Sequence, residues 1–268
     1  MISISVLIPV YKSGNKLRSC IESVLSQEVL PDEILIFDDC PEYPMKEIIH
    51  SYSSSLISYK INEKNLGRTM NYRSLVDNST SEYLLILDGD DNLIHDGFIK
   101  QAKNILSNND LVIFSGGAKL VRENDIIEKK LVKQSQIYPG FDYFKLWINS
   151  KQTLPHASTI FKKEIVIKEN LYTKNIVNTD IISQRCILLY GDIFLSNEIF
   201  SQWNFTGSNA SNIIDIKESI YNIKTIITPF KKALKIKGFS LGLFVWFLNS
   251  TFRYLASLLK TLIIKNYK

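Results

Sequence analysis

Apolar and polar residues alternate along the first 110 positions between the period of strands and the period of helices. Short apolar runs rich in β-branched residues, typical of buried strands, occupy residues 3–10, 32–39, 56–61 and 82–88. Helical spacing follows at 15–27, 69–78 and 96–109, with a more polar helix after the second strand. This alternation predicts βαβ units, and so an α/β fold whose central, mostly parallel sheet has helices on both faces.

The pattern is less regular after residue 110. It predicts a strand with a Gly-Gly break at 110–121, a helix at 140–150 and a strand leading into a helix at 154–164. A helix at 178–191 has Asn178 or Thr179 as its cap, and 203–212 is a turn-rich loop. We predict one domain at 1–215, with halves 1–109 and 110–215, and a helical tail at 216–268.

Polar residues gather at the ends of the first strands or in the loop after the third. In parallel sheets, ligands bind beyond the carboxyl ends of the strands. Four segments are therefore expected to meet at one edge of the sheet: Pro9–Tyr11, Asp38–Asp39, Asn65–Gly67 and Asp88–Asp91.

Three carboxylates follow the fourth strand directly. Two of them, spaced i and i+2, can close on Mg²⁺ or Mn²⁺ together with the diphosphate oxygens of a nucleotide, and Gly89 allows close approach of the backbone. An EF-hand starting at Asp88 is excluded because Leu93 and Ile99 stand where its glycine and glutamate belong. The alternative is a polar turn capped by aspartate.

The other strand-end residues have both a binding and a structural interpretation. Asp38 and Asp39 can accept hydrogen bonds from a base or a ribose, or can form an Asp turn before Pro41. Tyr11 offers a flat face to a base or is a rim aromatic. The turn at Asn65–Gly67 precedes Arg68, which can reach a phosphate or lie solvated on a helix.

Five ordered segments carry a resemblance to a known family: "SVLIPVYK", "LRSCIESVLSQ", "DEILIFDD", "NLGRTMNYR" and "YLLILDGDD". Together they resemble the nucleotide-binding half of a family-2 glycosyltransferase of the GT-A fold. The helix after the Asn-x-Gly turn departs from the commoner pattern, with Asn71-Tyr72-Arg73 in place of Ala-Arg-Asn.

The resemblance implies roles for the strand-end residues. Pro9, Tyr11, Asp38 and Asp39 would hold the nucleoside. Asp88 and Asp90 would form the D-x-D pair for the cation and diphosphate, with Asp91 adjacent. The implied nucleotide site as a whole comprises Pro9, Tyr11, Asp38, Asp39, Asn65, Gly67, Arg68, Asp88 and Gly89, and the implied metal site comprises Asp88, Asp90 and Asp91.

A weaker similarity extends to about residue 211. "NTDIISQRCILLYG" resembles the segment that carries the catalytic base, so Asp180 would be that base, while Thr179 replaces the usual glutamate. Thr206 stands where the family often has a metal-binding histidine. His156, Thr179 and Trp203 are the candidates for the acceptor side. A single aspartate base implies inversion at the anomeric carbon.

Composition is that of a globular protein, with 45% apolar and 22% charged residues in 268. Three cysteines without metal-like spacing indicate reduced thiols in a cytosolic protein. The N-terminal segment has no basic region or cleavage site and is interpreted as a core strand, not a signal peptide.

The tail has its own charge pattern. Residues 217–268 hold ten Lys and Arg against one acid, a net charge of +9, which leaves −4 of the total +5 for residues 1–216. Its longest uncharged run, Gly238 to Phe252, is shorter than the roughly 20 residues that span a bilayer. A helix lying on an anionic membrane fits this pattern, and packing on the catalytic domain or on a second subunit is the alternative. The wide apolar face argues against nucleic acid.

We therefore predict an inverting glycosyltransferase that uses Mn²⁺ or Mg²⁺ and a nucleotide-sugar, UDP-linked, with a glycan or lipid-linked acceptor in the synthesis of a surface polysaccharide. It would lie on the cytoplasmic face of the plasma membrane. Two alternatives stay open: a non-catalytic assembly partner with a degenerate site, and a sugar nucleotidyltransferase. The second needs a Gly-rich phosphate loop after the first strand, which "VYKSGNK" does not supply.

Overall fold

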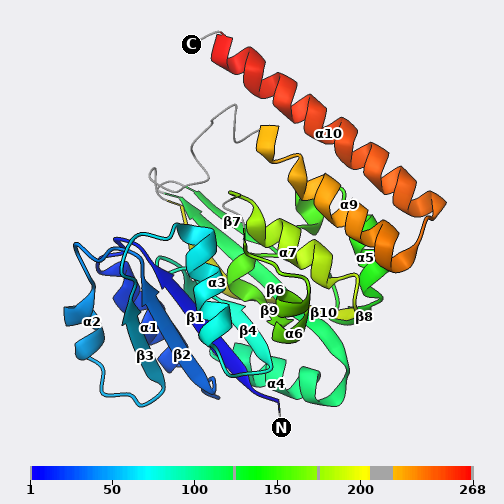
Figure 1. Ribbon diagram of the computed structural model, residues 1–268. Helices are drawn as coiled ribbons and strands as arrows, with labels where there is room; N and C mark the ends of the chain where they lie inside the picture. Colours follow the sequence, from blue (N-terminus) through cyan, green and yellow to red (C-terminus); the bar gives the residue numbers. More distant parts are fainter. Residues whose placement is uncertain (1, 123–124, 174–175, 206–219, 267–268) are drawn as a thin grey trace.

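A computed structural model describes residues 2–122, 125–173, 176–205 and 220–266 (Figure 1). Within these residues ten strands form one sheet. The strands are β1 (Ile4–Val10), β2 (Glu33–Asp38), β3 (Ile57–Ile61), β4 (Tyr83–Ile86), β5 (Asn92–Leu93), β6 (Leu111–Arg122), β7 (Asp125–Lys129), β8 (Gln136–Tyr138), β9 (Thr159–Lys162) and β10 (Asp192–Asn204).

The helices connect these strands and then continue beyond the sheet. They are α1 (Lys16–Leu25), α2 (Lys46–His50), α3 (Arg68–Asn78), α4 (Phe98–Asn108), α5 (Gly140–Leu146), α6 (Lys163–Lys168), α7 (Thr179–Ile187), α9 (Lys224–Lys237) and α10 (Leu241–Asn266), with 3₁₀ turns η1 (Ser150–Gln152) and η2 (His156–Ser158). The strands and helices expected in the first 110 residues are thus confirmed.

The strand order explains how the two halves of the chain join. The order is β3-β2-β1-β4-β9-β6-β10-β5, with β7 beside β6 and β8 beside β10. Strands β3, β2, β1 and β4 are parallel, as are β6 and β10, whereas β9 runs antiparallel between β4 and β6. The predicted fold class is confirmed, and each of its antiparallel pairs includes at least one strand from the second half of the chain.

Two apolar cores cover the two faces of the sheet, because side chains alternate along each strand. On β1, Leu7 belongs to one core, while Val6 and Ile8 belong to the other. Helices α3, α5 and α7 pack on the first face, and α1 and α4 on the second. Figure 1 shows the sheet between these layers.

Several elements differ from the sequence-based expectation. Strands β5, β7, β8 and β10 were not predicted. Trp203 and Asn204 end β10 and pair with β6, so the predicted turn-rich loop at 203–212 is wrong for these two residues; positions 206–212 lie outside the described residues. Pairing with the long strand β6 stabilises the extended conformation of these two residues. The local sequence does not indicate such pairing with a distant strand.

The described residues of the tail are largely helical, as expected, and include the helices α9 and α10. Helices α9 and α10 pack against each other, α9 also contacts α7, and α10 also contacts α5 (Figure 1). Among the helices in the described part of the chain, none has the length and hydropathy that crossing a bilayer requires.

Candidate functional site

The ends of β1, β2 and β4 meet at one edge of the sheet. The N–H of Asp39 donates a hydrogen bond to the carbonyl of Val10 at 2.8 Å, and the N–H of Gly89 donates one to the carbonyl of Pro9 at 3.2 Å. The expected convergence of the strand ends is therefore present in the structure. Its physical basis is the parallel register, which brings the carboxyl ends of neighbouring strands side by side.

Gly89 lies where the segment after β4 approaches the end of β1 closely. A Cβ at this position would meet the carbonyl of Pro9 at 3.2 Å and Oγ of Ser13 at 3.0 Å. A side chain here would push the loop after β4 away from β1. The sequence suggested that Gly89 allows a close approach of the backbone. In the structure, the backbone of Gly89 closely approaches the backbone of Pro9.

Asp38 is completely buried and organises the segment after β2. One carboxylate oxygen accepts a hydrogen bond from the N–H of Cys40 at 3.1 Å. The other accepts from the N–H of Met45 and the hydroxyl of Tyr59, both at 2.8 Å. These bonds match the structural interpretation of an Asp turn, and contact with a nucleoside stays a prediction for this residue.

Asp39 holds the loop that leads into α3. Its carboxylate accepts hydrogen bonds from the side chain of Asn62 at 2.9 Å and from the N–H groups of Leu66 and Gly67 at 2.8 Å. Asn62 also donates to Asn71 at 3.0 Å, which links this network to α3. A buried carboxylate satisfied in this way fixes the loop after β3 against the end of β2.

The Asn65–Gly67 segment forms a tight turn, as expected. The N–H of Gly67 donates to Oδ1 of Asn65 at 2.8 Å, and Gly67 has φ of +80°, a conformation that glycine adopts without strain. Arg68 begins α3, and its guanidinium donates to the carbonyl of Val177, just before α7. This bond joins the two halves of the site.

Tyr11 stands on the rim of the same edge and is half exposed. Lys12 lies over the ring of Tyr11 at 5.3 Å and over that of Tyr43 at 5.9 Å. Two accessible aromatic rings beside a cation offer a surface on which a base can stack. Tyr43 was not among the residues selected from the sequence, because a tyrosine in a Pro-rich turn carries no distinctive signal.

The carboxylates after β4 lie close together and are partly buried. The pKa of Asp90 is raised mainly by burial and, to a smaller extent, by the charge of Asp88. The pKa of Asp91 is raised well above its ordinary value, mainly by burial and then by the charges of Asp88 and Asp90. The positive charge of Lys16 opposes both shifts. Asp91 is buried, and its carboxylate accepts only a long hydrogen bond, 3.4 Å, from the N–H of Asn204 among the described residues.

This cluster has the donor chemistry that a divalent cation requires. Its oxygens are hard ligands of the kind that Mg²⁺ and Mn²⁺ prefer, and their mutual repulsion is relieved by a cation. Within the described residues, however, no group of three or more His, Cys, Asp and Glu side chains is arranged as a metal cage. A cation at Asp88, Asp90 and Asp91 would thus share its coordination shell with the diphosphate of a donor, and metal binding stays a prediction.

Replacing Asp91 with asparagine is expected to stabilise the metal-free protein. Because the pKa of Asp91 is higher in the folded than in the unfolded chain, the folded state binds the proton more tightly. The free energy of unfolding therefore decreases as pH rises from the ordinary pKa of 3.8 through the raised value. The cost of burying Asp91 is therefore larger at pH 7 than at pH 4, and Asp91→Asn removes it. We expect Tm to rise by a few degrees, at about 2–4 °C per kcal/mol, with a smaller gain near pH 4.

Calorimetric unfolding at pH 7 and pH 4 measures this effect. Asp96→Asn is the matched control, since Asp96 is an exposed aspartate in the following turn. An unchanged or lower Tm for Asp91→Asn at pH 7 would contradict the prediction.

Tyr72 occupies the centre of the site, although it was not a sequence candidate. Its hydroxyl donates a hydrogen bond to Oδ1 of Asp88 at 2.7 Å, and its ring is fully buried. The ring of His156 stacks on it with centroids 5.4 Å apart, and Tyr172 contacts it edge-on at 5.8 Å. The available sequence signal was the departure from the family pattern at Asn71-Tyr72-Arg73.

The charges around Tyr72 link the two halves of the site. Burial raises the pKa of Tyr72 well above its ordinary value, and the carboxylates of Asp88 and Asp180 raise it further, while Arg68 opposes the shift. The phenol therefore stays protonated and donates to Asp88. The charge of Asp180, from the second half of the chain, therefore acts on the same phenol as the charge of Asp88.

Asp180 lies in the first turn of α7 and is half-buried. Within the described residues, its carboxylate accepts no hydrogen bond and forms no ion pair, so it is available to a substrate proton. The helix begins at Thr179 with Asn178 as its cap residue, in agreement with the expected start. Thr179 is buried and donates its N–H to the carbonyl of Ile176 at 3.2 Å.

His156 reaches the site because β9 is antiparallel to β4. The beginning of β9 therefore lies at the edge where β4 ends, and η2 immediately precedes it. Both ring nitrogens of His156 are buried without a hydrogen-bond partner among the described residues. The structure thus brings His156 beside Tyr72, whereas a role in acceptor binding stays a prediction.

Trp203 lies at the end of β10, and its ring contacts Phe205 edge-on at 5.7 Å. The neighbouring Asn204 donates from its side chain to the carbonyl of Asp90 at 2.9 Å, so this strand end adjoins the carboxylate cluster. Thr206, at the position of the family histidine, lies outside the described residues.

Replacing Tyr72 with phenylalanine is expected to reduce glycosyl transfer by about 10- to 100-fold. The change removes one hydrogen bond to a charged group, worth about 1.5–3 kcal/mol, and leaves the ring that packs on His156. The fall in kcat/KM is measured against Tyr83→Phe. Tyr83 is equally buried, and its hydroxyl donates to the carbonyl of Leu111 at 2.7 Å, away from the site. Equal turnover by the two variants would exclude a role for the Tyr72 hydroxyl.

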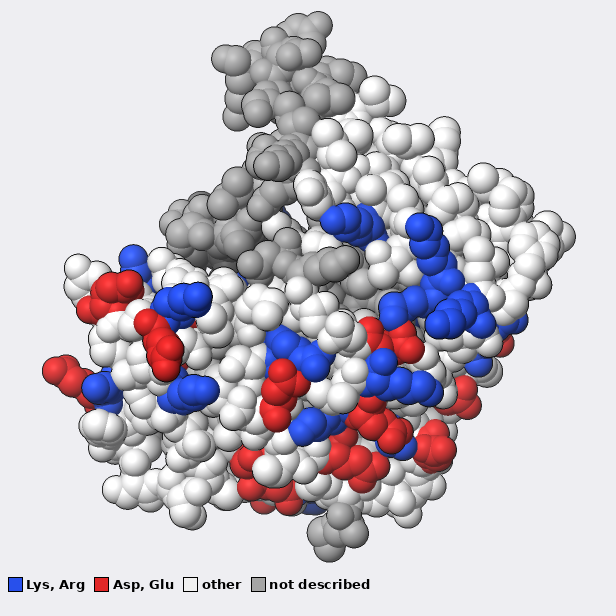
Figure 2. Space-filling view, viewed as in Figure 1, with Lys and Arg blue, Asp and Glu red and all other residues white. Residues whose placement is uncertain are grey.

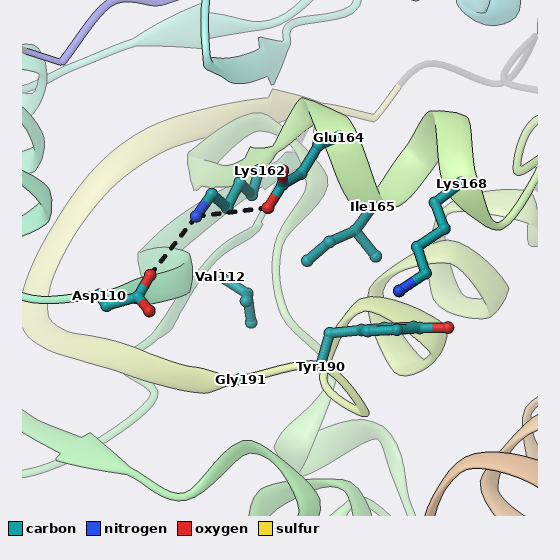
Figure 3. A pocket seen from close by; sticks show the side chains of 8 residues that line it. All are labelled: Asp110, Val112, Lys162, Glu164, Ile165, Lys168, Tyr190 and Gly191. Atoms are coloured by element: carbon teal, nitrogen blue, oxygen red, sulfur yellow. Dashed lines mark hydrogen bonds and ion pairs between the residues drawn. The ribbon is translucent and has the colours of Figure 1, made fainter.

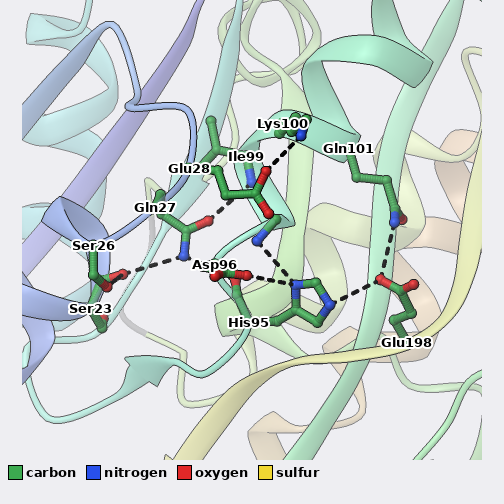
Figure 4. Close-up of polar contacts among 11 residues, drawn as sticks. Ser23, Ser26, Gln27, Glu28, His95, Asp96, Ile99, Lys100, Gln101 and Glu198 are labelled. Atoms are coloured by element: carbon green, nitrogen blue, oxygen red, sulfur yellow. Dashed lines mark hydrogen bonds and ion pairs between the residues drawn. The ribbon is translucent and has the colours of Figure 1, made fainter.

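Two hollows lie apart from these residues. One, of about 350 Å³, is lined by Lys162 between Asp110 and Glu164, with Lys168 beside Tyr190 (Figure 3). The other, of about 330 Å³, adjoins His95, whose ring points towards Glu198 on one side and Asp96 on the other (Figure 4). Neither hollow is lined by a candidate residue of the site.

Comparisons with known proteins agree with this architecture. The chain is 24% identical over 246 residues to the cholesterol galactosyltransferase of Borreliella burgdorferi, covering 85% of this chain and 68% of that protein. It is 26% identical over 250 residues to an uncharacterised glycosyltransferase of Methanocaldococcus jannaschii, covering 91% and 83%. The crystal structure of residues 1–349 of S. aureus TarS with UDP-GlcNAc has a TM-score of 0.71 at 14% identity, covering 88% of this chain and 67% of that one.

The family model of glycosyl transferase family 2 matches residues 5–168, which include the candidate residues at the ends of β1, β2 and β4. This match covers more than half of the 268 residues, in the region where the sheet brings the carboxylates together. The protein therefore belongs to glycosyl transferase family 2 and is an enzyme that transfers glycosyl groups.

Proposed function

We propose that this protein is an inverting, metal-dependent glycosyltransferase that moves a sugar from a UDP-sugar to a hydroxyl group of a glycan or lipid-linked acceptor. The observation that carries this proposal is that two carboxylates act on Tyr72: Asp88, which accepts its hydrogen bond and begins the Asp88–Asp91 cluster, and Asp180 on α7. The similar fold of TarS, whose structure contains UDP-GlcNAc, supports a UDP-linked donor.

The residues have distinct tasks in this reaction. Asp88, Asp90 and Asp91 would hold Mn²⁺ or Mg²⁺ together with the donor diphosphate, and the cation would neutralise the charge that develops on the leaving group. Tyr72 donates to Asp88 and keeps one of its oxygens in place. Tyr11 offers its ring to the base, and Arg68 supplies positive charge near the start of α3.

Asp180 is the proposed general base. Its carboxylate takes the proton from the acceptor hydroxyl, whose oxygen forms a bond to the anomeric carbon. The bond between that carbon and the diphosphate oxygen breaks, and the nucleoside diphosphate leaves with the bonding electrons. A single displacement of this kind inverts the configuration at the anomeric carbon.

We further propose that this transfer contributes to a surface polysaccharide and takes place at the cytoplasmic face of the plasma membrane, with the enzyme bound peripherally. The support is the charge and apolar character of the tail, which holds ten basic residues and one acid. A surface that attracts anionic lipids suits an acceptor carried on a lipid.

A screen of sugar nucleotides with Mn²⁺ tests the function directly. We expect release of UDP from at least one UDP-sugar, and no release after the metal is removed by a chelator. A sugar nucleotidyltransferase would instead release pyrophosphate from a nucleoside triphosphate and a sugar phosphate. Absence of nucleotide release from every donor, together with no metal-dependent binding of UDP in calorimetry, would support the non-catalytic alternative.

A further inference from the structure

The inner face of α10 is firmly attached to the catalytic domain. Trp246 is buried, its indole N–H donates to the carbonyl of Trp147 at 3.0 Å, and its ring contacts Phe144 at 4.5 Å. The guanidinium of Arg185 on α7 lies 4.9 Å from the ring of Trp147 and 5.4 Å from that of Trp246. Leu243 is also fully buried. The first half of α10 is thus part of the domain's core.

The opposite face of α10 is apolar and exposed. We call it the outer row; its side chains are between 45% and 74% exposed, and its members are Leu241, Val245, Leu248, Phe252, Leu255 and Leu259. They recur every three or four residues, so they form one stripe about 27 Å long at 1.5 Å per residue. In Figure 2 the surface in the region of α10 shows little charge, in contrast to the mixed charges on the body of the domain. An apolar stripe of this size marks an interaction surface.

The charges of the two tail helices favour one kind of partner for the outer row. Lys231, Lys235 and Lys237 on α9 and Arg253 on α10 are exposed, and the described residues of these two helices include no acid. A second copy of the chain would oppose a tail of net charge +9 with an identical one. Anionic lipid headgroups have the complementary sign, and lipid chains have the matching polarity.

We propose that the outer row docks on the surface of an anionic lipid bilayer, with the basic side chains of α9 at its margin. Because the inner face of α10 is anchored through Trp246, the bilayer would hold the whole catalytic domain in one orientation and not on a flexible tether. The outer row is thus the part of the protein that would produce the membrane location proposed above. Its binding to lipid does not depend on which donor or acceptor the enzyme uses.

Flotation of the full chain with vesicles tests the docking surface. We expect binding to vesicles of phosphatidylglycerol and phosphatidylcholine, and much weaker binding to phosphatidylcholine alone. Leu248→Glu combined with Phe252→Glu should lower partitioning at least tenfold, because two exposed apolar side chains no longer enter the interface. Ile126→Glu is the matched control, since Ile126 is an equally exposed apolar residue on β7.

A second variant tests the electrostatic part. Lys231→Gln, Lys235→Gln and Lys237→Gln together should lower binding to the anionic vesicles by about a hundredfold, at roughly 1 kcal/mol per charge. Unfolding curves and release of UDP with a water-soluble acceptor, unchanged in all variants, would show that the fold and the active site are intact. This separates a failure of docking from a failure of the proposed function.

Three results would overturn the proposal. The first is no binding of the wild-type chain to anionic vesicles, and the second is equal binding by the Leu248→Glu/Phe252→Glu variant. The third is a lipid-free dimer in sedimentation velocity that the same variant dissociates, because the outer row would then be covered by a second copy.

Discussion

Asp180→Asn is expected to lower kcat for glycosyl transfer by about 10²- to 10⁴-fold, the usual contribution of a general base. Asparagine keeps the size of the side chain and its place in the first turn of α7, but it cannot take the acceptor proton. Within the described residues the carboxylate has no hydrogen bond or ion pair to lose, so the change should leave the fold intact. Binding of UDP and the KM for the donor should be little changed.

Single-turnover measurements with a saturating donor separate chemistry from binding in this variant. Asp110→Asn is the matched control: its side chain is 92% exposed and lies at the start of β6, at the other end of the sheet. Transfer by Asp180→Asn at the rate of this control would remove Asp180 from the mechanism. A rise in KM alone would assign it to donor binding.

Asp90→Ala should reduce the metal-dependent affinity for UDP by at least about a hundredfold. Burial and then neighbouring carboxylates raise the pKa of Asp90 and of Asp91, and a cation with a diphosphate relieves such an environment. Removing one carboxylate removes a ligand and part of the charge that attracts the cation. Calorimetric titration with UDP, with and without Mn²⁺, measures the loss.

The matched control for this variant is Asp96→Ala, which changes an exposed aspartate near the same loop. Its carboxylate lies 3.8 Å from His95 and outside the cluster. Equal Mn²⁺-dependent affinity in Asp90→Ala and the wild-type chain would exclude Asp90 from a metal site. No metal-dependent binding in the wild-type chain itself would instead favour a degenerate site.

The first half of the fold was predictable because its signals are local. Strands such as β1 are continuous apolar runs buried on both faces, and α1 and α4 carry apolar residues at helical spacing. The strand-end residues of the candidate site follow from the same rule, since parallel register brings the ends of β1, β2 and β4 together. For the strand-end residues, the order of strands and helices in the sequence was enough to predict that they lie at the same edge of the sheet.

Strands of the second half were harder to predict because they depend on their partners. Residues 192–204 include polar residues and have no clean alternation, yet they form β10 between β6 and β5. Strand β5 lies in the first half of the chain but has only two residues, and no periodic pattern exists at that length. In each case, pairing with a distant strand supplied the backbone hydrogen bonds that local preference did not indicate.

The contacts of Tyr72 show the same limit within the site. In the sequence it is one residue of a helix that departs from the family pattern. In the structure it connects Asp88, His156 and Tyr172, which are separated from it by between 16 and 100 positions. Only the antiparallel insertion of β9 places His156 on its ring. The buried carboxylates Asp38 and Asp39 likewise proved to organise the surrounding loops, which a sequence pattern cannot distinguish from ligand binding.

The sequence by itself determined the α/β class, the edge where Asp88–Asp91 meets the other strand ends, and the basic, apolar character of the tail. Each of these follows from periodicity or composition, which do not depend on contacts between residues that are distant in the sequence. The tertiary structure alone decided that Tyr72 donates to Asp88 and lies within range of the charge of Asp180, and that α10 buries Trp246 while leaving Phe252 exposed. The sequence of a helix that is largely apolar does not indicate which face is buried. Packing against α5 and α9 determines which face of α10 stabilises the fold and which face stays available to a partner.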